Sequence, residues 1–327
     1  MKLVLAKTLW GVDGADDEDQ WDSVFGRIKE DGYTMIECVP AFTFGGAPER
    51  AQKFSSLAAK HGLQVICLLC TSGGYYQQGE FVYCSSFELD VHLNSVSKEI
   101  ELAMHANPVH INCHGGVDAW DHETQVKFLL GAIEIAKEKK ISISFETHRQ
   151  RIFCNPFQTR SLLADERLKG NQELKITADL SHWVVCCERQ LHTPSCWVSR
   201  DPWWQDLLEQ VAAHVKLIHC RVGHPQGPQV PDVTDPAYKL DVKAHLDMWG
   251  EIWNVQRKGG ATETWCEVEH GPAPYMWTLP HTGVPVADLW KVNNDLAKMI
   301  RAEFQDVDDV NSLHASMSGS NRFAAES

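Results

Sequence analysis

Residues 121–148 read DHETQVKFLLGAIEIAKEKKISISFETH, and this stretch decides the fold class. Its first twenty residues predict an amphipathic helix, because Asp121 can cap the amino end and lysines fill the last turn. The strand predicted over 141–148 then alternates apolar and polar side chains, which places them on opposite faces. A helix that leads into a strand in this way is typical of α/β proteins.

The same alternation continues in both directions along the chain. We expect strands at 3–10, 33–40, 63–71, 110–116, 141–148, 173–183, 216–224 and 261–272. We expect helices near 16–31, 48–61, 88–106, 121–140, 159–167, 201–215, 240–257 and 286–304. Eight strands alternating with eight helices favour an α/β (β/α)8 TIM barrel that forms a single domain.

The domain is expected to cover residues 1–305, and the polar tail at 306–327 is expected to be disordered. A doubly wound open sheet is the alternative architecture. That fold favours a glycine-rich turn after the first strand, and the segment GVDGADD at 11–17 lacks the G-x-G-x-x-G spacing.

Composition narrows the range of partners and compartments. Among 327 residues, 30 basic and 44 acidic side chains give a net charge of −14, so nucleic acid is not an expected partner. No apolar run is long enough for a membrane span, and the run that opens MKLVLAKTLWGVDG is too short for a signal sequence. Eleven scattered cysteines favour a reducing, cytoplasmic location. The lone CxxC pair of Cys67 and Cys70 is interpreted as two core cysteines, and a homo-oligomer is left open.

Polar residues near the ends of four successive strands are the candidate site. Catalytic groups of a TIM barrel lie at the carboxyl ends of its strands. Alternation places Glu146, Asp179, His219 and Glu269 at that end, facing the barrel interior. Glu267 shares a face with Glu269 and is the alternative to it.

Three carboxylates at one barrel mouth would repel one another, and a divalent cation removes that repulsion. Three oxygen ligands and one nitrogen suit Mn²⁺, which we expect, and also Mg²⁺, Co²⁺ or Zn²⁺. The predicted metal ligands are therefore Glu146, Asp179, His219 and Glu269.

The segments FETH, ADLSHW, LIHCRVGH and EVEHGPAPY resemble those of the xylose isomerase-like TIM barrels. This superfamily includes tagatose and psicose 3-epimerases, hydroxypyruvate isomerase, inosose dehydratase and endonuclease IV. The resemblance implies a single metal held by the same four residues, with His182 and Arg221 on the substrate. Arg221 stands closer to His219 than the epimerase pattern has it. Val268 and His270 also depart from the wording PEFGPPPY of a similar subgroup.

The expected function is isomerisation or epimerisation of a small sugar or polyhydroxy carbonyl compound. Glu146 and Glu269 would remove and return a proton through a metal-stabilised enediolate. His182 and Arg221 would bind substrate oxygens, and His114 and Trp10 would line the pocket. For Trp10, core packing is the alternative.

Two long loops, at 72–85 and 223–239, are candidate lids over the barrel mouth. Tyr75 and Tyr76 in the first loop either stack on a sugar or are simply exposed. No glycine-rich phosphate cradle is evident, which favours an unphosphorylated substrate.

Other functions stay open at this point. A lyase or dehydratase would use the same enolate chemistry. A zinc hydrolase like endonuclease IV would use additional histidines, which the chain has at 110, 114, 148, 182 and 224, but the net charge opposes DNA binding. A non-catalytic sugar-binding barrel is the remaining alternative.

Overall fold

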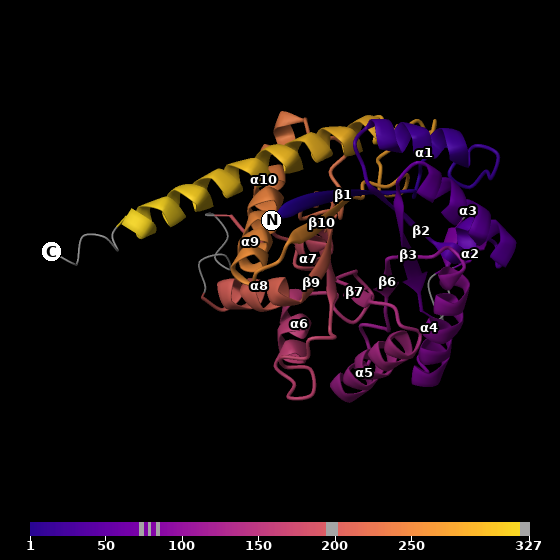
Figure 1. Ribbon diagram of the computed structural model, residues 1–327, viewed down its shortest axis with the longest axis horizontal. Helices are drawn as coiled ribbons and strands as arrows, with labels where there is room; N and C mark the ends of the chain where they lie inside the picture. The colour runs from indigo at the N-terminus through magenta and orange to yellow at the C-terminus, as the bar shows by residue number, and fades with distance from the viewer. Residues whose placement is uncertain (72–74, 78–79, 83–85, 194–201, 321–327) are drawn as a thin grey trace.

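The computed structural model describes residues 1–71, 75–77, 80–82, 86–193 and 202–320 (Figure 1). Within 75–77, 80–82 and 306–320 it describes the backbone only. Of the predicted lid at 72–85, only the backbone of 75–77 and 80–82 is described, so the side chains of Tyr75 and Tyr76 fall outside the described residues.

A closed barrel of eight parallel strands forms the centre of the molecule, which confirms the predicted (β/α)8 architecture (Figure 1). Its strands follow the order β1-β10-β9-β8-β7-β6-β3-β2 around the barrel. They are β1 (Lys2–Thr8), β2 (Met35–Cys38), β3 (Gln64–Cys70), β6 (His110–His114), β7 (Ile143–Glu146), β8 (Ile176–Ala178), β9 (Val215–Cys220) and β10 (Glu263–Val268). The first and last strands pair with each other, Lys2 opposite Glu263 and Ala6 opposite Glu267.

Helices surround the barrel and bury their apolar faces against its outer surface (Figure 1). They are α1 (Trp21–Glu30), α2 (Pro40–Thr43), α3 (Pro48–Lys60), α4 (Leu89–Met104), α5 (His122–Glu138), α6 (Pro156–Leu163), α7 (Leu180–Cys186), α8 (Pro202–His214), α9 (Lys239–Lys258) and α10 (Leu289–Ser320), with a 3₁₀ turn at Pro236–Tyr238. The predicted cap of α5 is present, since the Asp121 side chain accepts a hydrogen bond from the backbone N–H of Thr124.

The barrel interior is layered. A small apolar cluster, formed by Val4, Ala6, Met35, Ile66, Leu217 and Trp265, fills its lower part. Polar side chains lie above it, at the carboxyl ends of the strands. Every strand contributes to the wall, but β6 to β10 contribute most of the chemistry described below.

Several elements differ from the sequence prediction. The strand expected at 173–183 is only β8, because the chain turns at Asp179 and continues as α7. The Asp179 carboxylate caps that helix by accepting from the backbone N–H of Ser181 at 3.0 Å. A short helix therefore replaces the second half of the expected strand.

Two further differences concern a loop and the final helix. The loop expected after β3 contains a small antiparallel hairpin, β4 (Tyr75–Gln77) with β5 (Glu80–Val82). The final helix, expected to end near residue 304, runs to Ser320 and projects past the barrel (Figure 1). The backbone of residues 306–320 thus continues α10 into the segment predicted to be a polar tail.

Candidate metal centre

The structure brings together the four side chains predicted from strand parity. One ligating atom from each of Glu146, Asp179, His219 and Glu269 lies within 4.8 Å of the others, and all four residues are buried. Glu146 ends β7, Asp179 follows β8, His219 is in β9 and Glu269 follows β10. The parallel register sets His219 opposite Glu267, so Glu269 lies two residues closer to the mouth than the residue paired with His219.

Three donor atoms of this cluster have no hydrogen-bond partner although they are buried. They are Oε1 of Glu146, Nδ1 of His219 and Oε2 of Glu269. Nδ1 of His219 and Oε2 of Glu269 are 2.7 Å apart without forming a hydrogen bond. Buried polar atoms normally have partners, so an unpaired set that converges on one point fits a divalent cation.

Arg221 occupies the fourth side of this cluster. Its Nη2 donates to Oδ2 of Asp179 and lies 3.3 Å from Oε2 of Glu269. The same nitrogen is 3.0 Å from Nε2 of His182, which stands in the first turn of α7. Arg221 therefore neutralises part of the carboxylate charge, and it shares Asp179 with any cation that binds.

Glu146 is held in place from the β6 side. Its Oε2 accepts from Nδ2 of Asn112 at 2.7 Å and lies 2.9 Å from Nε2 of His114. These contacts leave Oε1 of Glu146 free to face the centre. His114, expected to line the pocket, is thus a partner of a predicted ligand.

Burial and the neighbouring charges set the ionisation of the cluster. Burial alone would raise the pKa of Glu146, but His114 and His219 hold it well below its usual range. Burial likewise opposes the charged form of His114, yet Glu146 raises the pKa of His114 to about 10. Burial raises the pKa of Asp179 to about 6, against the opposing effect of Arg221. Imidazolium and guanidinium groups thus balance part of the negative charge of the carboxylates in this centre.

Aromatic rings cover the cluster on the mouth side. Trp10 packs edge-on against Tyr275 with ring centroids 5.0 Å apart, and its ring lies directly against Gly271. The guanidinium of Arg221 lies 4.8 Å from the Tyr275 ring, and that of Arg149 lies 4.9 Å from it. Trp10 and Tyr275 therefore form an aromatic layer over Arg221, and part of the Trp10 surface is exposed.

A row of three histidines with their rings in tilted contact continues the site toward β6. The ring centroid of His148 is 4.3 Å from that of His114 and 4.0 Å from that of His182. His114, Glu146 and His148 form another group whose ligand atoms lie within 4.8 Å of one another. The predicted substrate residues His182, Arg221 and His114 are thus all within reach of the centre.

A second acidic pair lies one layer deeper. Glu37 of β2 and Glu267 of β10 are both buried, and each places a carboxylate oxygen near Nε2 of His219, at 3.5 Å and 3.8 Å. Burial raises the pKa of both carboxyl groups, and His219 opposes that rise in each of them. Glu269, rather than Glu267, therefore belongs to the four-residue cluster.

Sequence reasoning missed Glu37, Asn112 and Tyr275 as members of the site, and it considered His148 only as an extra histidine of the hydrolase alternative. Glu37 was detectable, since it is the one acidic residue within an otherwise apolar strand, MIEC. Tyr275 stands in the quoted segment EVEHGPAPY, but its position over Arg221 depends on the path of the loop after β10. No local pattern in the sequence specifies that path.

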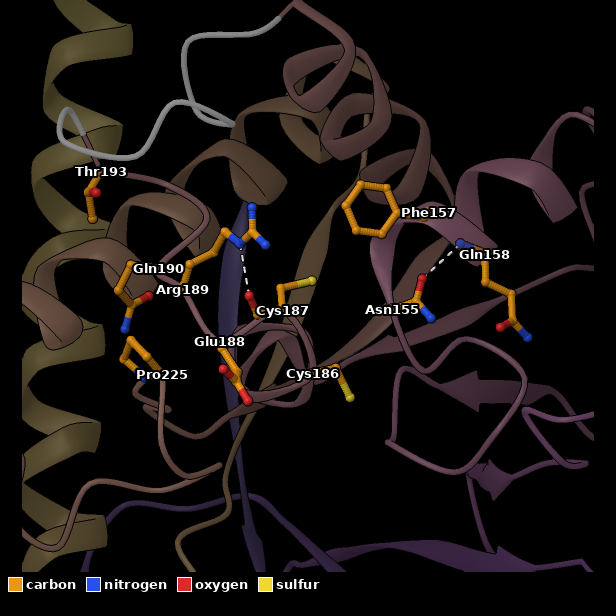
Figure 2. A pocket seen from close by; sticks show the side chains of 10 residues that line it. All are labelled: Asn155, Phe157, Gln158, Cys186, Cys187, Glu188, Arg189, Gln190, Thr193 and Pro225. Carbon is orange, nitrogen blue, oxygen red and sulfur yellow. Dashed lines mark hydrogen bonds between the residues drawn. The ribbon is translucent and has the colours of Figure 1, made fainter.

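An open groove of about 1200 Å³ lies outside the cluster (Figure 2). The amino end of α6 and the segment from Cys186 to Gln190 line it, and none of the predicted site residues does. In Figure 2 the Asn155 side chain is bonded to the backbone of Gln158, and Arg189 turns back onto the carbonyl of Cys187. These two side chains are therefore bonded to the local backbone.

None of the helices in the described part of the chain is both long and apolar enough to cross a bilayer. No curated protein matches the sequence. Comparison with solved structures, in contrast, finds many similar folds at low sequence identity, and three of them are described below.

A xylose isomerase-like TIM barrel protein from Mycobacterium smegmatis, in complex with magnesium, is 15% identical with a TM-score of 0.53, covering 93% of this chain and 97% of that one. A D-tagatose 3-epimerase-like protein is 12% identical with a TM-score of 0.58, covering 94% and 99%. Endonuclease IV from Thermus thermophilus is 13% identical with a TM-score of 0.53, covering 94% and 100%.

At such identities these likenesses show the fold alone. The family model for xylose isomerase-like TIM barrels matches residues 25–230 of the sequence, from α1 to beyond β9. That match spans more than half of the chain. The protein therefore belongs to the xylose isomerase-like TIM barrel family.

Proposed function

We propose that this protein is a divalent-metal-dependent isomerase or epimerase of a small sugar or polyhydroxy carbonyl compound. The observation that supports it is the convergence of Glu146, Asp179, His219 and Glu269 with three unpaired buried ligand atoms. These four side chains would hold the ion. When bound, a divalent cation stabilises negative charge on substrate oxygens and makes the adjacent C–H bond more acidic.

The two glutamates are the proposed proton-transfer groups. Glu146 ends β7 and Glu269 follows β10, so β8 and β9 lie between them in the barrel, and this separation supports an approach to the substrate carbon from different sides. Asn112 and His114 fix one oxygen of Glu146 and leave the other to accept a proton. One glutamate removes the proton, and the other returns it.

Arg221 and His182 are the proposed groups that bind substrate oxygens. They are buried, they contact each other, and they lie beside Glu269 and Asp179. Donors fixed in a dry site stabilise negative charge that develops on oxygen during proton removal. Trp10 and Tyr275 would exclude water from above.

Mn²⁺ is the proposed ion, with Mg²⁺, Co²⁺ and Zn²⁺ as alternatives, because the ligand set contains three carboxylates and one imidazole. The magnesium complex of the Mycobacterium smegmatis protein supports a hard divalent cation in this fold. Elemental analysis of protein purified without chelator would test it. Protein that carries no ion and binds none of the four metals on titration would contradict the proposal.

Deuterium exchange tests the reaction itself. The metal-loaded protein is incubated in D₂O with a panel of free and phosphorylated ketoses and aldoses, and the sugars are analysed by mass spectrometry. A substrate should gain one carbon-bound deuterium as it is converted to its isomer or epimer. Loss of water from the substrate would instead indicate the dehydratase alternative, and cleavage of abasic-site DNA would indicate the endonuclease alternative.

A further inference from the structure

The imidazole of His219 lies between two separate carboxylate groups. Its Nδ1 faces the mouth, 2.7 Å from Glu269 and 3.4 Å from Glu146. Its Nε2 faces downward, 3.5 Å from Glu37 and 3.8 Å from Glu267. The two ring nitrogens therefore meet different partners, and the lower pair takes no part in the proposed reaction.

The lower pair is unusual because its charge is scarcely compensated. Oε2 of Glu37 and both carboxylate oxygens of Glu267 are buried and have no hydrogen-bond partner. Within the described residues, His219 is the sole basic side chain within 4.0 Å of either carboxylate. Below the pair lies the apolar cluster that contains Ala6 and Leu217. Two carboxylates in such a place lower the stability of the fold, so their presence calls for a role other than folding.

In a neutral imidazole one ring nitrogen carries the N–H and the other carries a lone pair. The hydrogen-bond partner of either nitrogen decides which of the two is protonated. Carboxylates are strong acceptors, so a pair of them below Nε2 favours the N–H on that side. Nδ2 of Asn112 also approaches Nε2, at 3.3 Å; it donates one N–H to Glu146 at 2.7 Å, and its second N–H competes with the two carboxylates for this side of the ring. With the N–H on Nε2, the lone pair on Nδ1 points at the mouth cluster.

We propose that Glu37 and Glu267 are positioning residues that hold the Nε2–H of His219 and so aim Nδ1 at the cation. This inference rests on the proposed metal-dependent function, because it assigns a role to residues around one predicted ligand. Carboxylate groups behind a metal-binding histidine fix its tautomer and its ring orientation in this way. A second cation between Glu37 and Glu267 is the rival interpretation, but it would require His219 to bind two ions as an imidazolate.

The test replaces the pair without changing its volume much. The double variant Glu37→Met/Glu267→Met removes both acceptors, while Glu37→Gln and Glu267→Gln each keep an acceptor but lose the charge. Glu99→Met is the matched control, since Glu99 is a largely buried glutamate of α4 that bonds to Ser95 and to the backbone of Cys70. Zn²⁺ affinity is measured by calorimetry with a competing chelator, and folding is checked by thermal unfolding without metal.

The double variant should bind Zn²⁺ about 10- to 100-fold more weakly, as expected for a lost outer partner. Each glutamine variant should lose less, and Glu99→Met should bind like the wild type. Without metal the double variant should unfold at the same temperature as the wild type or higher, because two unpaired buried carboxylates are gone. A purely structural role for the pair predicts the opposite sign of that change.

A spectroscopic measurement addresses the tautomer directly. In the Zn²⁺-loaded protein with ¹⁵N-labelled histidine, the resonance lost in His219→Gln should show a protonated Nε2 and a metal-bound Nδ1. Unchanged Zn²⁺ affinity in the double variant, or a metal-bound Nε2 in the wild type, would contradict the positioning role and leave the proposed metal-dependent function intact. Two ions per wild-type chain, one of them lost in the double variant, would favour the second cation instead. Wild-type protein that binds no ion would contradict both this inference and the proposed function.

Discussion

His219 and His182 both lie in the centre, but they reach it from different elements. His219 is a residue of β9 and presents Nδ1 to two carboxylates, whereas His182 stands in α7 and contacts Arg221. We therefore expect His219→Ala to weaken metal binding by about 100-fold or more, beyond the loss expected for an outer partner. We expect His182→Ala to keep the metal and to lower turnover by about tenfold, the effect of one lost hydrogen bond.

Metal titration of both variants, followed by kinetics at saturating metal, separates the two roles. Equal loss of metal from both variants would mean that His182 is a ligand.

Glu146 and Glu269 are predicted to act as metal ligands and as bases. Glutamine at either position should therefore lower turnover more than it weakens substrate binding. Glu146→Gln and Glu269→Gln keep the shape and one oxygen donor, and each should lower kcat by roughly 10²- to 10⁴-fold with a smaller effect on KM. One of the two variants should still exchange substrate hydrogen for deuterium without completing the conversion. Near-normal turnover of both variants, with metal bound, would rule out the two-base mechanism.

Lys7 is a buried cation on the outer side of β1. Its Nζ has no hydrogen-bond partner and lies 4.2 Å from the centre of the Trp290 ring. Burial lowers the pKa of Lys7 to about 8. Between pH 8 and pH 10.5 the unfolded chain therefore binds a proton that the folded chain does not, and stability should rise with pH by up to about 3 kcal/mol.

Denaturant unfolding of the wild type and Lys7→Met across this range checks the effect. The free energy of unfolding of the wild type should rise between pH 8 and pH 10.5, and in Lys7→Met this rise should be smaller by up to about 3 kcal/mol. At neutral pH the variant should be more stable than the wild type, because it buries no charge at this position. Parallel curves for the two proteins would show that Lys7 titrates normally.

Strand alternation predicted the individual site residues best where the strand continues to the residue concerned. Glu146 and His219 are on β7 and β9, and counting by two along those strands gives their direction. Arg221 lies just beyond β9, yet its guanidinium reaches Asp179. Glu37 stands out as an acidic residue in its own strand, but its proximity to Glu267 could not be predicted, because the two are distant in the sequence and only barrel closure brings them together.

At the scale of elements, the turn between β8 and α7 shows where sequence reasoning failed. The apolar and polar residues of ADLSHW also fit a strand pattern, so alternation alone extended β8 too far. The capping bond from Ser181 to Asp179 decides the outcome, and aspartate at a helix start is a signal that could have been used. The length of α10 was underestimated because the segment after Asp306 is rich in Ser, Asp and Asn, although Val307, Val310, Leu313 and Met317 recur there at helical spacing.

The loop after β10 packs on the loop after β1 through Gly271. A Cβ atom at this position would lie 2.0 Å from the Trp10 ring. Gly271→Ala should therefore destabilise the protein by about 1–3 kcal/mol, the usual effect of overpacking. Trp10→Ala/Gly271→Ala should lose less than the sum of the two single changes, because removing the ring removes the clash.

Chemical denaturation of the four proteins in this cycle provides the measurement. Additive losses in the free energy of unfolding would show that the Trp10 ring moves aside freely and that the layer of Trp10 and Tyr275 is loosely packed.

At the scale of the whole molecule, the ion and the fold should stabilise each other. The predicted ligands come from the ends of four strands in the second half of the barrel, so an ion held by them would bind the folded chain and not the unfolded one. A metal concentration 100 times the Kd should add about 2.7 kcal/mol, which corresponds to a Tm increase of about 5 °C.

Thermal unfolding with EDTA, and then with each of Mn²⁺, Mg²⁺, Co²⁺ and Zn²⁺, tests this coupling. His219→Ala is the control and should show little change. An identical Tm under all conditions in the wild type would contradict the predicted centre.

The pairing of β1 with β10 also affects how the chain is made. Residues 2–8 leave the ribosome early, but their neighbour at 263–268 is translated long afterwards. At the usual speed of translation this delay is on the order of tens of seconds. Throughout that time the nascent chain exposes an unpaired edge on β1, and Glu269 is still missing from the cluster. The emerging protein should therefore depend on chaperones during synthesis and acquire its ion only near release.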